Sequence, residues 1–157
     1  MLLSLARPSS GIGSPSTPFT ILVIDDDALV LSTLTELLRA HGHRVLEAAN
    51  GRDGLALTRA ERPDLILVDY HMPEMDGLAV VGALKSDAVT RGIPVVAFTS
   101  GTAADANQLV RAGCIGFIPK PFEPGSLPAL VAEFLRATVA RDRRTPAPTR
   151  SRPATGP

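Results

Sequence analysis

Polar and apolar residues change pattern at regular intervals along the middle of this chain. Four short segments are almost entirely apolar, at 21–24, 65–68, 94–98 and 114–118. Unbroken apolar runs of this length are typical of parallel strands that helices cover on both faces. Residues Arg44 to Ala48 instead alternate between polar and apolar, which predicts a half-exposed strand at an edge of the sheet.

Segments with helical character separate these strands. The first follows Asp27 and ends at His41-Gly42-His43, and the last begins near Ser126. Three more helices are expected at about 51–60, from an N-cap at Asp76 to about 85, and at about 103–112. The apolar stripes of the first and last helices consist of Val30, Leu34, Leu37 and Leu38, and of Leu127, Leu130, Val131, Phe134 and Leu135. Five strands alternating with five helices predict an α/β fold with a parallel sheet.

The composition adds an aliphatic core and two polar ends to this picture. The 157 residues are 45% hydrophobic but include only five Phe, one Tyr and no Trp. Residues 1–18 are rich in Ser, Pro and Gly, and residues 141–157 are rich in Pro and Arg. Because neither end can bury enough apolar surface to offset its ordering entropy, both are predicted to be disordered, and the folded domain is placed at 19–140.

The net charge of zero conceals an uneven distribution. The predicted domain carries 10 Lys and Arg against 15 Asp and Glu, a net charge of −5, whereas residues 141–157 carry five Arg against one Asp. The arginines of the tail are interpreted as a solvated segment rather than as a nucleic-acid contact, since no aromatic residues lie among them. No direct binding of nucleic acid is therefore expected.

The chain shows no sign of secretion or of membrane insertion. Residues 1–7 are too short for the apolar region of a signal peptide, and no apolar run approaches the roughly 20 residues of a spanning helix. The one cysteine, Cys114, cannot form an internal disulfide and is expected to be a small buried hydrophobe. A cytoplasmic protein without membrane contact is the expectation.

Residues that can bind ions or take part in reactions cluster at the ends of the predicted strands. Function in open α/β sheets collects outside the carboxyl ends of the strands. This rule selects the residues that follow the four apolar strands: Asp25, Asp26, Asp27, Asp69, Thr99, Ser100 and Lys120. Crowded carboxylates repel one another unless a cation neutralises them, and Mg²⁺ or Mn²⁺ prefers such oxygen ligands. A carboxylate can also act as a nucleophile and form an aspartyl phosphate. These residue types together suit phosphoryl transfer to an aspartate.

Four segments of the chain resemble the signature segments of two-component response-regulator receiver domains. They are Val23-Ile24-Asp25-Asp26-Asp27, Asp69-Tyr70-His71-Met72-Pro73-Glu74-Met75-Asp76-Gly77, Phe98-Thr99-Ser100 and Lys120-Pro121-Phe122. They occur in the family's order and at fitting spacing, and the resemblance spans residues 19 to about 138. It implies the flavodoxin-like form of the fold, a doubly wound (βα)5 architecture with strand order 2-1-3-4-5.

The resemblance also implies a role for each residue of the site. Asp69 matches the phosphoacceptor, Thr99 the switch hydroxyl and Lys120 the lysine that pairs with the charge. Asp26 would bind the metal directly and Asp25 through a water. Two backbone features complete the set: the metal would take the carbonyl oxygen of His71, and the Lys120–Pro121 bond would be cis.

Two positions depart from the commonest pattern of the family. Phe117 stands where many members have a Tyr or His that swings inward on activation, and it has no hydroxyl or ring nitrogen to hydrogen-bond. Pro119 precedes Lys120 and stiffens the approach to it. Both departures affect switching more than phosphorylation.

The implied partners follow from the family. The phosphoryl donor would be a sensor histidine kinase or a histidine phosphotransfer protein. Because nothing after residue 140 is long or apolar enough for an output domain, a downstream protein would bind the face made by the fourth helix, the fifth strand and the fifth helix. The formation of a homodimer on phosphorylation is left as a further possibility of the family. Slow hydrolysis of the phosphoryl group would limit the signal without making the protein an enzyme.

Two other functions are weighed against this one. An enzyme similar to haloacid-dehalogenase phosphatases would use Asp25 and Asp27 as nucleophile and acid, but the small hydroxyl residue expected shortly after them is absent. A degenerate receiver that never uses phosphate would be expected to lack at least one residue of the site. Asp27 is instead predicted to cap the first helix, and His41 and His43 to frame its end, where positive charge is favourable.

Overall fold

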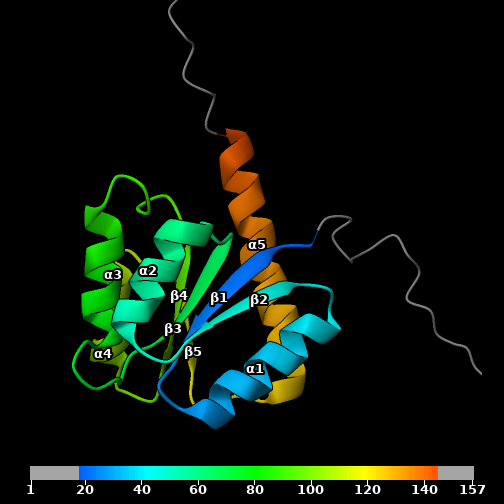
Figure 1. The fold of residues 1–157 in the computed structure, drawn as a ribbon, viewed down its shortest axis with the longest axis horizontal. Helices are drawn as coiled ribbons and strands as arrows, with labels where there is room; N and C mark the ends of the chain where they lie inside the picture. The colour runs from blue at the N-terminus through cyan, green and yellow to red at the C-terminus, as the bar shows by residue number, and fades with distance from the viewer. Residues whose placement is uncertain (1–17, 145–157) are drawn as a thin grey trace, which may run out of the picture.

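The computed structural model describes residues 18–144, which form a five-stranded parallel sheet flanked by helices (Figure 1). The strand order is β2-β1-β3-β4-β5, which confirms the predicted doubly wound fold. The strands are β1 Thr20–Ile24, β2 Arg44–Ala48, β3 Leu65–Asp69, β4 Val95–Thr99 and β5 Gly116–Pro119. The helices are α1 Ala28–Ala40, α2 Gly51–Glu61, α3 Gly77–Ser86, α4 Ala103–Ala112 and α5 Leu127–Arg144, with a 3₁₀ turn at Pro124–Ser126.

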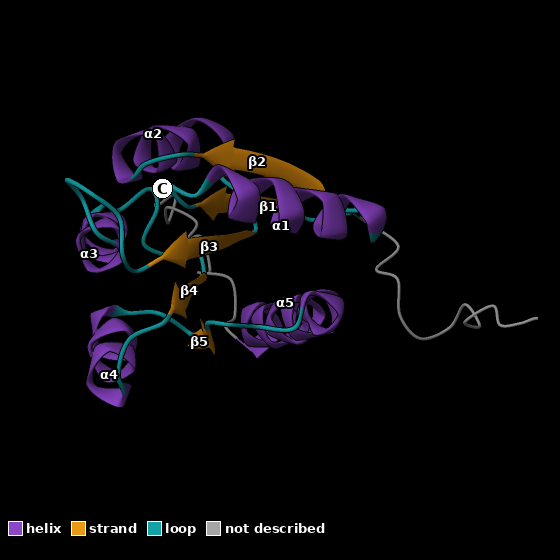
Figure 2. Cartoon of the chain, turned by 90° about the horizontal axis from the view of Figure 1, so that it is seen from below, coloured by secondary structure: helices purple, strands orange, loops and turns teal. Residues whose placement is uncertain are grey.

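The helices cover the two faces of the sheet unequally. Figure 2 shows α1 and α5 on one face and α2, α3 and α4 on the other. Side chains of a strand alternate between faces, so Ile21 and Val23 pack beneath α1 and α5, while Leu22 and Ile24 pack beneath the other three helices. The alternating strand β2 lies at an edge, as its pattern predicts.

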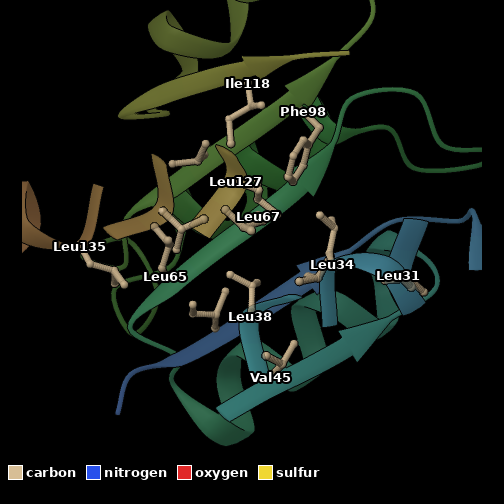
Figure 3. Packing of buried hydrophobic residues seen from close by; sticks show 14 residues of the cluster. Leu31, Leu34, Leu38, Val45, Leu65, Leu67, Phe98, Ile118, Leu127 and Leu135 are labelled. Atoms are coloured by element: carbon tan, nitrogen blue, oxygen red, sulfur yellow. The ribbon is translucent and has the colours of Figure 1, made fainter. Parts of the chain in front are cut away.

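The core between these layers is mainly aliphatic, as the composition predicts. Figure 3 shows the cluster beneath α1 and α5, in which leucines of α1 meet leucines of β3 and α5. Phe98 is the largest fully buried side chain. It lies at the end of β4 beside Phe122, with ring centroids 5.4 Å apart, and therefore joins the core to the edge of the sheet that carries the charged residues.

Side-chain caps start the helices at the carboxyl edge of the sheet. The carboxylate of Asp27 accepts hydrogen bonds from the backbone N–H groups of Leu29 and Val30, which confirms its predicted role as an N-cap. Asp76 caps α3 as predicted, accepting from the N–H of Ala79. Helix α4 starts with a capping box made by Thr102 and Asp105, so its first turn is well defined.

Two boundaries differ from those predicted by more than one residue. Strand β5 begins at Gly116 rather than Cys114, because the Cys114 N–H bonds back to the Leu109 carbonyl and closes the end of α4. Cys114 itself is buried as expected. Helix α5 continues to Arg144, past the domain boundary placed at 140.

The described residues test only part of the predicted disorder, and they include no candidate membrane-spanning helix. Of the segments predicted to be disordered, 1–17 and 145–157 lie outside the described residues, whereas 141–144 are helical. Among residues 18–144, no helix combines the length and apolar character that a bilayer crossing requires.

His43 departs from the favourable charged role predicted for it. Its side chain is buried, and its Nδ1 has no hydrogen-bond partner among the described residues. Burial, and after it the neighbouring charge of His41, lowers the pKa of His43 below its ordinary value of 6.5. The folded protein therefore disfavours the imidazolium form of this residue.

This burial predicts a loss of stability in mild acid. Below the unfolded pKa of about 6.5 the unfolded chain takes up a proton at His43 that the folded chain resists, so the free energy of unfolding should fall as pH drops from about 7 to about 5. Chemical denaturation of wild type and His43→Leu across this range checks it. The variant should lose part of the pH dependence, and the exposed control His71→Asn should keep it; equal slopes for all three proteins would contradict the prediction.

Candidate functional site

The polar residues selected from the sequence meet because four parallel strands end at one edge of the sheet. Ile24 of β1 pairs with Val68 of β3, so Asp25 and Asp69 follow side by side. Asp69 in turn is in register with Phe98, and Thr99 with Pro119. Beyond β5, the Lys120 N–H donates to the Thr99 carbonyl over 2.8 Å, which holds the lysine backbone against the end of β4.

Three carboxylates form the centre of this site. Asp25, Asp26 and Asp69 each offer an oxygen, and these atoms all lie within 4.8 Å of one another. Asp25 and Asp69 are buried, with 1% and 5% of their surfaces exposed, while Asp26 is exposed. Hard oxygen donors with one side open to water are the set that Mg²⁺ and related divalent cations prefer. The donor chemistry of the site therefore fits such an ion.

Lys120 joins two of these carboxylates. Its Nζ lies 3.1 Å from Asp69 Oδ1 and 3.3 Å from Asp25 Oδ2. Burial by itself favours the neutral amine, but the hydrogen bonds and negative charges of Asp69 and Asp25 outweigh it and raise the pKa of Lys120. The site thus holds a permanent cation beside the carboxylate of Asp69.

The remaining predicted residues surround this centre at different distances. Thr99 is buried at the end of β4, and its Oγ1 accepts a hydrogen bond of 2.9 Å from the Gly101 N–H. Phe117 lies on β5 opposite Ala97, with 44% of its surface exposed, and is outside the carboxylate cluster. The imidazole of His71 is exposed and meets the ring of Tyr70 edge-on. The Lys120–Pro121 bond is cis, in agreement with the expectation.

Comparison with known families decides what this arrangement is. Residues 21–132, most of the chain, match the response regulator receiver domain. The chain belongs to this family. Receiver domains are signalling modules of two-component systems, so the chain is a signalling protein whose family interacts with histidine kinases or phosphotransfer proteins.

Individual relatives agree with the family match. The chain is 39% identical to the protein PilH of Pseudomonas aeruginosa over 108 residues, which cover 68% of this chain and 89% of PilH. It is 36% identical to the polar-differentiation response regulator DivK of Brucella anthropi over 105 residues, covering 66% of this chain and 85% of DivK. The crystal structure of the chemotaxis protein CheY4 of Vibrio cholerae superposes with a TM-score of 0.70 at 28% identity, over 74% of this receiver and 98% of CheY4.

The haloacid-dehalogenase alternative assigns the acid to Asp27, which caps α1 in this receiver. The carboxylate of Asp27 is taken up by the first turn of α1, where it accepts two backbone hydrogen bonds. Asp27 therefore has the capping role predicted for it, and the family match favours a receiver over a phosphatase.

Burial and a neighbouring negative charge disfavour the ionised carboxylate of Asp25. Burial is the main cause that raises its pKa above the ordinary 3.8, and the charge of Asp69 adds to it. A hydrogen bond from the Asp27 N–H and the charge of Lys120 act in the opposite direction but do not cancel the rise. The ionised carboxylate is therefore less favourable in the folded than in the unfolded chain.

Neutralising Asp25 should consequently stabilise the metal-free receiver. A carboxyl whose folded pKa is raised contributes stability below its unfolded pKa and loses it as pH rises, so at neutral pH the charge of Asp25 is a cost that Asp25→Asn removes. If the cluster binds Mg²⁺, the same change should also weaken the stabilisation by the ion, which mass action puts at about 2.7 kcal/mol for an ion at a hundred times its Kd.

Thermal unfolding in EDTA and in Mg²⁺ checks both effects. Asp27→Asn is the matched control, since asparagine caps a helix as well as aspartate does, and it should behave like wild type. An Asp25→Asn variant that is less stable than wild type in EDTA, or that Mg²⁺ stabilises equally, would contradict the prediction.

One residue that positions Asp69 was not identified as part of the site from the sequence. A Cβ atom on Gly77 would lie 2.5 Å from the carbonyl oxygen of Asp69 and 2.8 Å from Cα of Tyr70. The Gly77 N–H also donates to the Tyr70 carbonyl over 2.8 Å. The first turn of α3 therefore packs directly on the backbone of the central carboxylate. From the sequence, Asp76 is predicted to be an N-cap and Gly77 is only part of a signature segment, because sequence spacing does not reveal a close backbone approach.

Proposed function

We propose that this receiver accepts a phosphoryl group on Asp69 from the phosphohistidine of a sensor histidine kinase or a histidine phosphotransfer protein. The observation that carries the proposal is the contact between Asp69 Oδ1 and Lys120 Nζ at 3.1 Å within a three-carboxylate cluster. Family membership supports it. Asp69 is the member of the cluster that ends the central strand β3, with β1 and β4 on either side.

In the proposed reaction a carboxylate oxygen of Asp69 attacks the phosphorus atom. The new O–P bond forms as the N–P bond to the donor imidazole breaks, and the bonding pair of electrons returns to that imidazole nitrogen, which takes up a proton. The ammonium of Lys120 pairs with the negative charge that the phosphoryl oxygens bring into a largely buried site.

A divalent cation is part of this proposal. Asp26 and Asp69 would hold it directly, Asp25 through a water, and the backbone carbonyl of His71 would complete the protein ligands. Bound there, Mg²⁺ or Mn²⁺ would neutralise charge on the phosphoryl oxygens. The exposed imidazole of His71 supports a role for its backbone rather than its ring.

The proposed switch runs through Thr99. Its Oγ1 now accepts from the Gly101 N–H, and a hydroxyl that accepts one hydrogen bond still has a proton to donate. Moving to a phosphoryl oxygen on Asp69 would release Gly101, which immediately precedes the capping box of α4. The start of α4 would then shift, and Phe117 on the adjacent strand could rotate toward the space that Thr99 leaves.

The output surface in this proposal is the face formed by α4, β5 and α5. Two of the large apolar side chains that are exposed in the described residues lie on it, Val110 with 48% and Phe117 with 44% of its surface exposed. Such side chains favour docking of a protein partner. A downstream protein, or a second copy in a homodimer formed on phosphorylation, would bind this face. Both events would take place in the cytoplasm. Slow hydrolysis of the acyl phosphate would then end the signal.

Intact mass spectrometry tests the proposal. The full chain incubated with acetyl phosphate and Mg²⁺ should gain the mass of one phosphoryl group, and reduction with borohydride followed by peptide mapping should locate it at Asp69. EDTA should suppress the gain because the carboxylate cluster then lacks its cation. No mass gain, or a gain that maps to another residue, would overturn the proposed function.

A further inference from the structure

The chain has one tyrosine, Tyr70, and it lies directly after Asp69. Its backbone is bonded on two sides: the N–H donates to the Phe98 carbonyl of β4 over 2.9 Å, and the carbonyl accepts from the Gly77 N–H of α3 over 2.8 Å. Its ring packs against the core cluster beneath α2, α3 and α4. Tyr70 therefore has little freedom to move apart from the segment that carries Asp69.

The hydroxyl of Tyr70 reaches the neighbouring helix. It donates to Oε1 of Gln108 in the middle of α4, over 3.4 Å. The two residues are far apart in sequence and come from segments that meet only in the folded chain. At 3.4 Å this contact is longer than a typical O–H···O hydrogen bond, so a shift of a few tenths of an ångström in either segment would make or break it.

This contact is separate from the route through Thr99. That route runs from the end of β4 to the first turn of α4, whereas Tyr70 starts from β3 and reaches α4 past its first turn. It also supplies a hydroxyl on an aromatic ring, which Phe117 on β5 lacks.

We propose that Tyr70 is a positioning residue that ties the Asp69 segment to α4 through Gln108 and holds α4 in its unphosphorylated arrangement. The inference rests on the proposed function, because it concerns how a phosphoryl group on Asp69 is sensed. We place this contact in the unphosphorylated state, because the proposed switch moves the start of α4 and a contact that is already 3.4 Å long would not survive that movement. Removing the Tyr70–Gln108 contact lowers the free-energy cost of leaving the unphosphorylated arrangement. A ligand that favours the phosphorylated arrangement should then bind with higher apparent affinity.

Beryllium fluoride with Mg²⁺, a mimic of the acyl phosphate, is the probe. Calorimetric titration of the full chain should show Tyr70→Phe binding it about twofold more tightly than wild type, the lower end of what one intramolecular hydrogen bond supports, because this contact is long. Gln108→Ala should give the same gain. The double variant should bind no more tightly than either single variant, because both changes remove one contact. Asn107→Ala, the neighbouring exposed amide on α4, is the matched control and should bind like wild type.

Amide chemical shifts provide a measurement without metal or mimic. In Tyr70→Phe, which keeps the ring and its packing, backbone amides around Gln108 should shift, and those of α1 on the opposite face should not. Three results would each overturn the inference: additive gains in the double variant, unchanged or weaker binding by Tyr70→Phe, or unperturbed α4 amides. If wild type still takes up a phosphoryl group at Asp69, the proposed function stands in each of these cases. A wild-type chain that takes up no phosphoryl group would overturn both.

Discussion

Asp69→Asn is expected to abolish phosphoryl uptake from acetyl phosphate and from a phosphohistidine donor, because an amide lacks the carboxylate oxygen that would form the O–P bond in the proposed reaction. The substitution keeps the size of the side chain. It removes one of three crowded carboxylates, so the folded chain relieves a repulsion with Asp25 while Lys120 keeps Asp25 as a partner. The loss of uptake is therefore expected in a protein that remains folded.

Intact mass after incubation with acetyl phosphate and Mg²⁺ measures this loss, and a thermal unfolding curve confirms the fold. Asp27→Asn is again the control, since Asp27 lies two positions from Asp25 and serves as the N-cap of α1. It should take up the phosphoryl group as wild type does. Uptake by Asp69→Asn, or loss of uptake in Asp27→Asn, would show that the nucleophile lies elsewhere in the site.

Gly77→Ala is expected to destabilise the receiver and to displace Asp69. The added methyl group would lie 2.5 Å from the Asp69 carbonyl oxygen, a distance at which the backbone of β3 or the first turn of α3 must move. Overpacking of this kind costs about 1–3 kcal/mol of the free energy of unfolding. Because the displaced atoms belong to the backbone that carries the nucleophile, phosphoryl uptake should slow as well.

Gly82→Ala in the same helix is the matched comparison. Its Cβ would meet nothing within 4 Å, and the position is exposed, so alanine should stabilise α3 by about 0.5–1 kcal/mol through its better helix propensity. Urea denaturation of the two variants should therefore give shifts of opposite sign from wild type. Equal shifts would mean that helix propensity, and not the approach of α3 to Asp69, governs position 77.

The order and type of the elements could be predicted from the sequence because their signals are local. Unbroken apolar runs and helical stripes depend on neighbours a few residues apart, and the alternation in Arg44–Ala48 predicted the edge strand. The caps at Asp27 and Asp76 are local in the same sense. Asp25, Asp69, Thr99 and Lys120 could be chosen since a parallel sheet brings the carboxyl ends of its strands to one edge.

Other features were decided by the tertiary structure alone, because they depend on contacts between segments that are distant in sequence. The approach of Gly77 to the backbone of Asp69 and the reach of Tyr70 to Gln108 arise only when α3 and α4 settle on the sheet. Burial of His43 reverses the charge preference expected at a helix end, because desolvation depends on what covers a side chain. The sequence by itself thus determined the fold and the charged residues of the site, while packing decided how closely α3 and α4 are joined to Asp69.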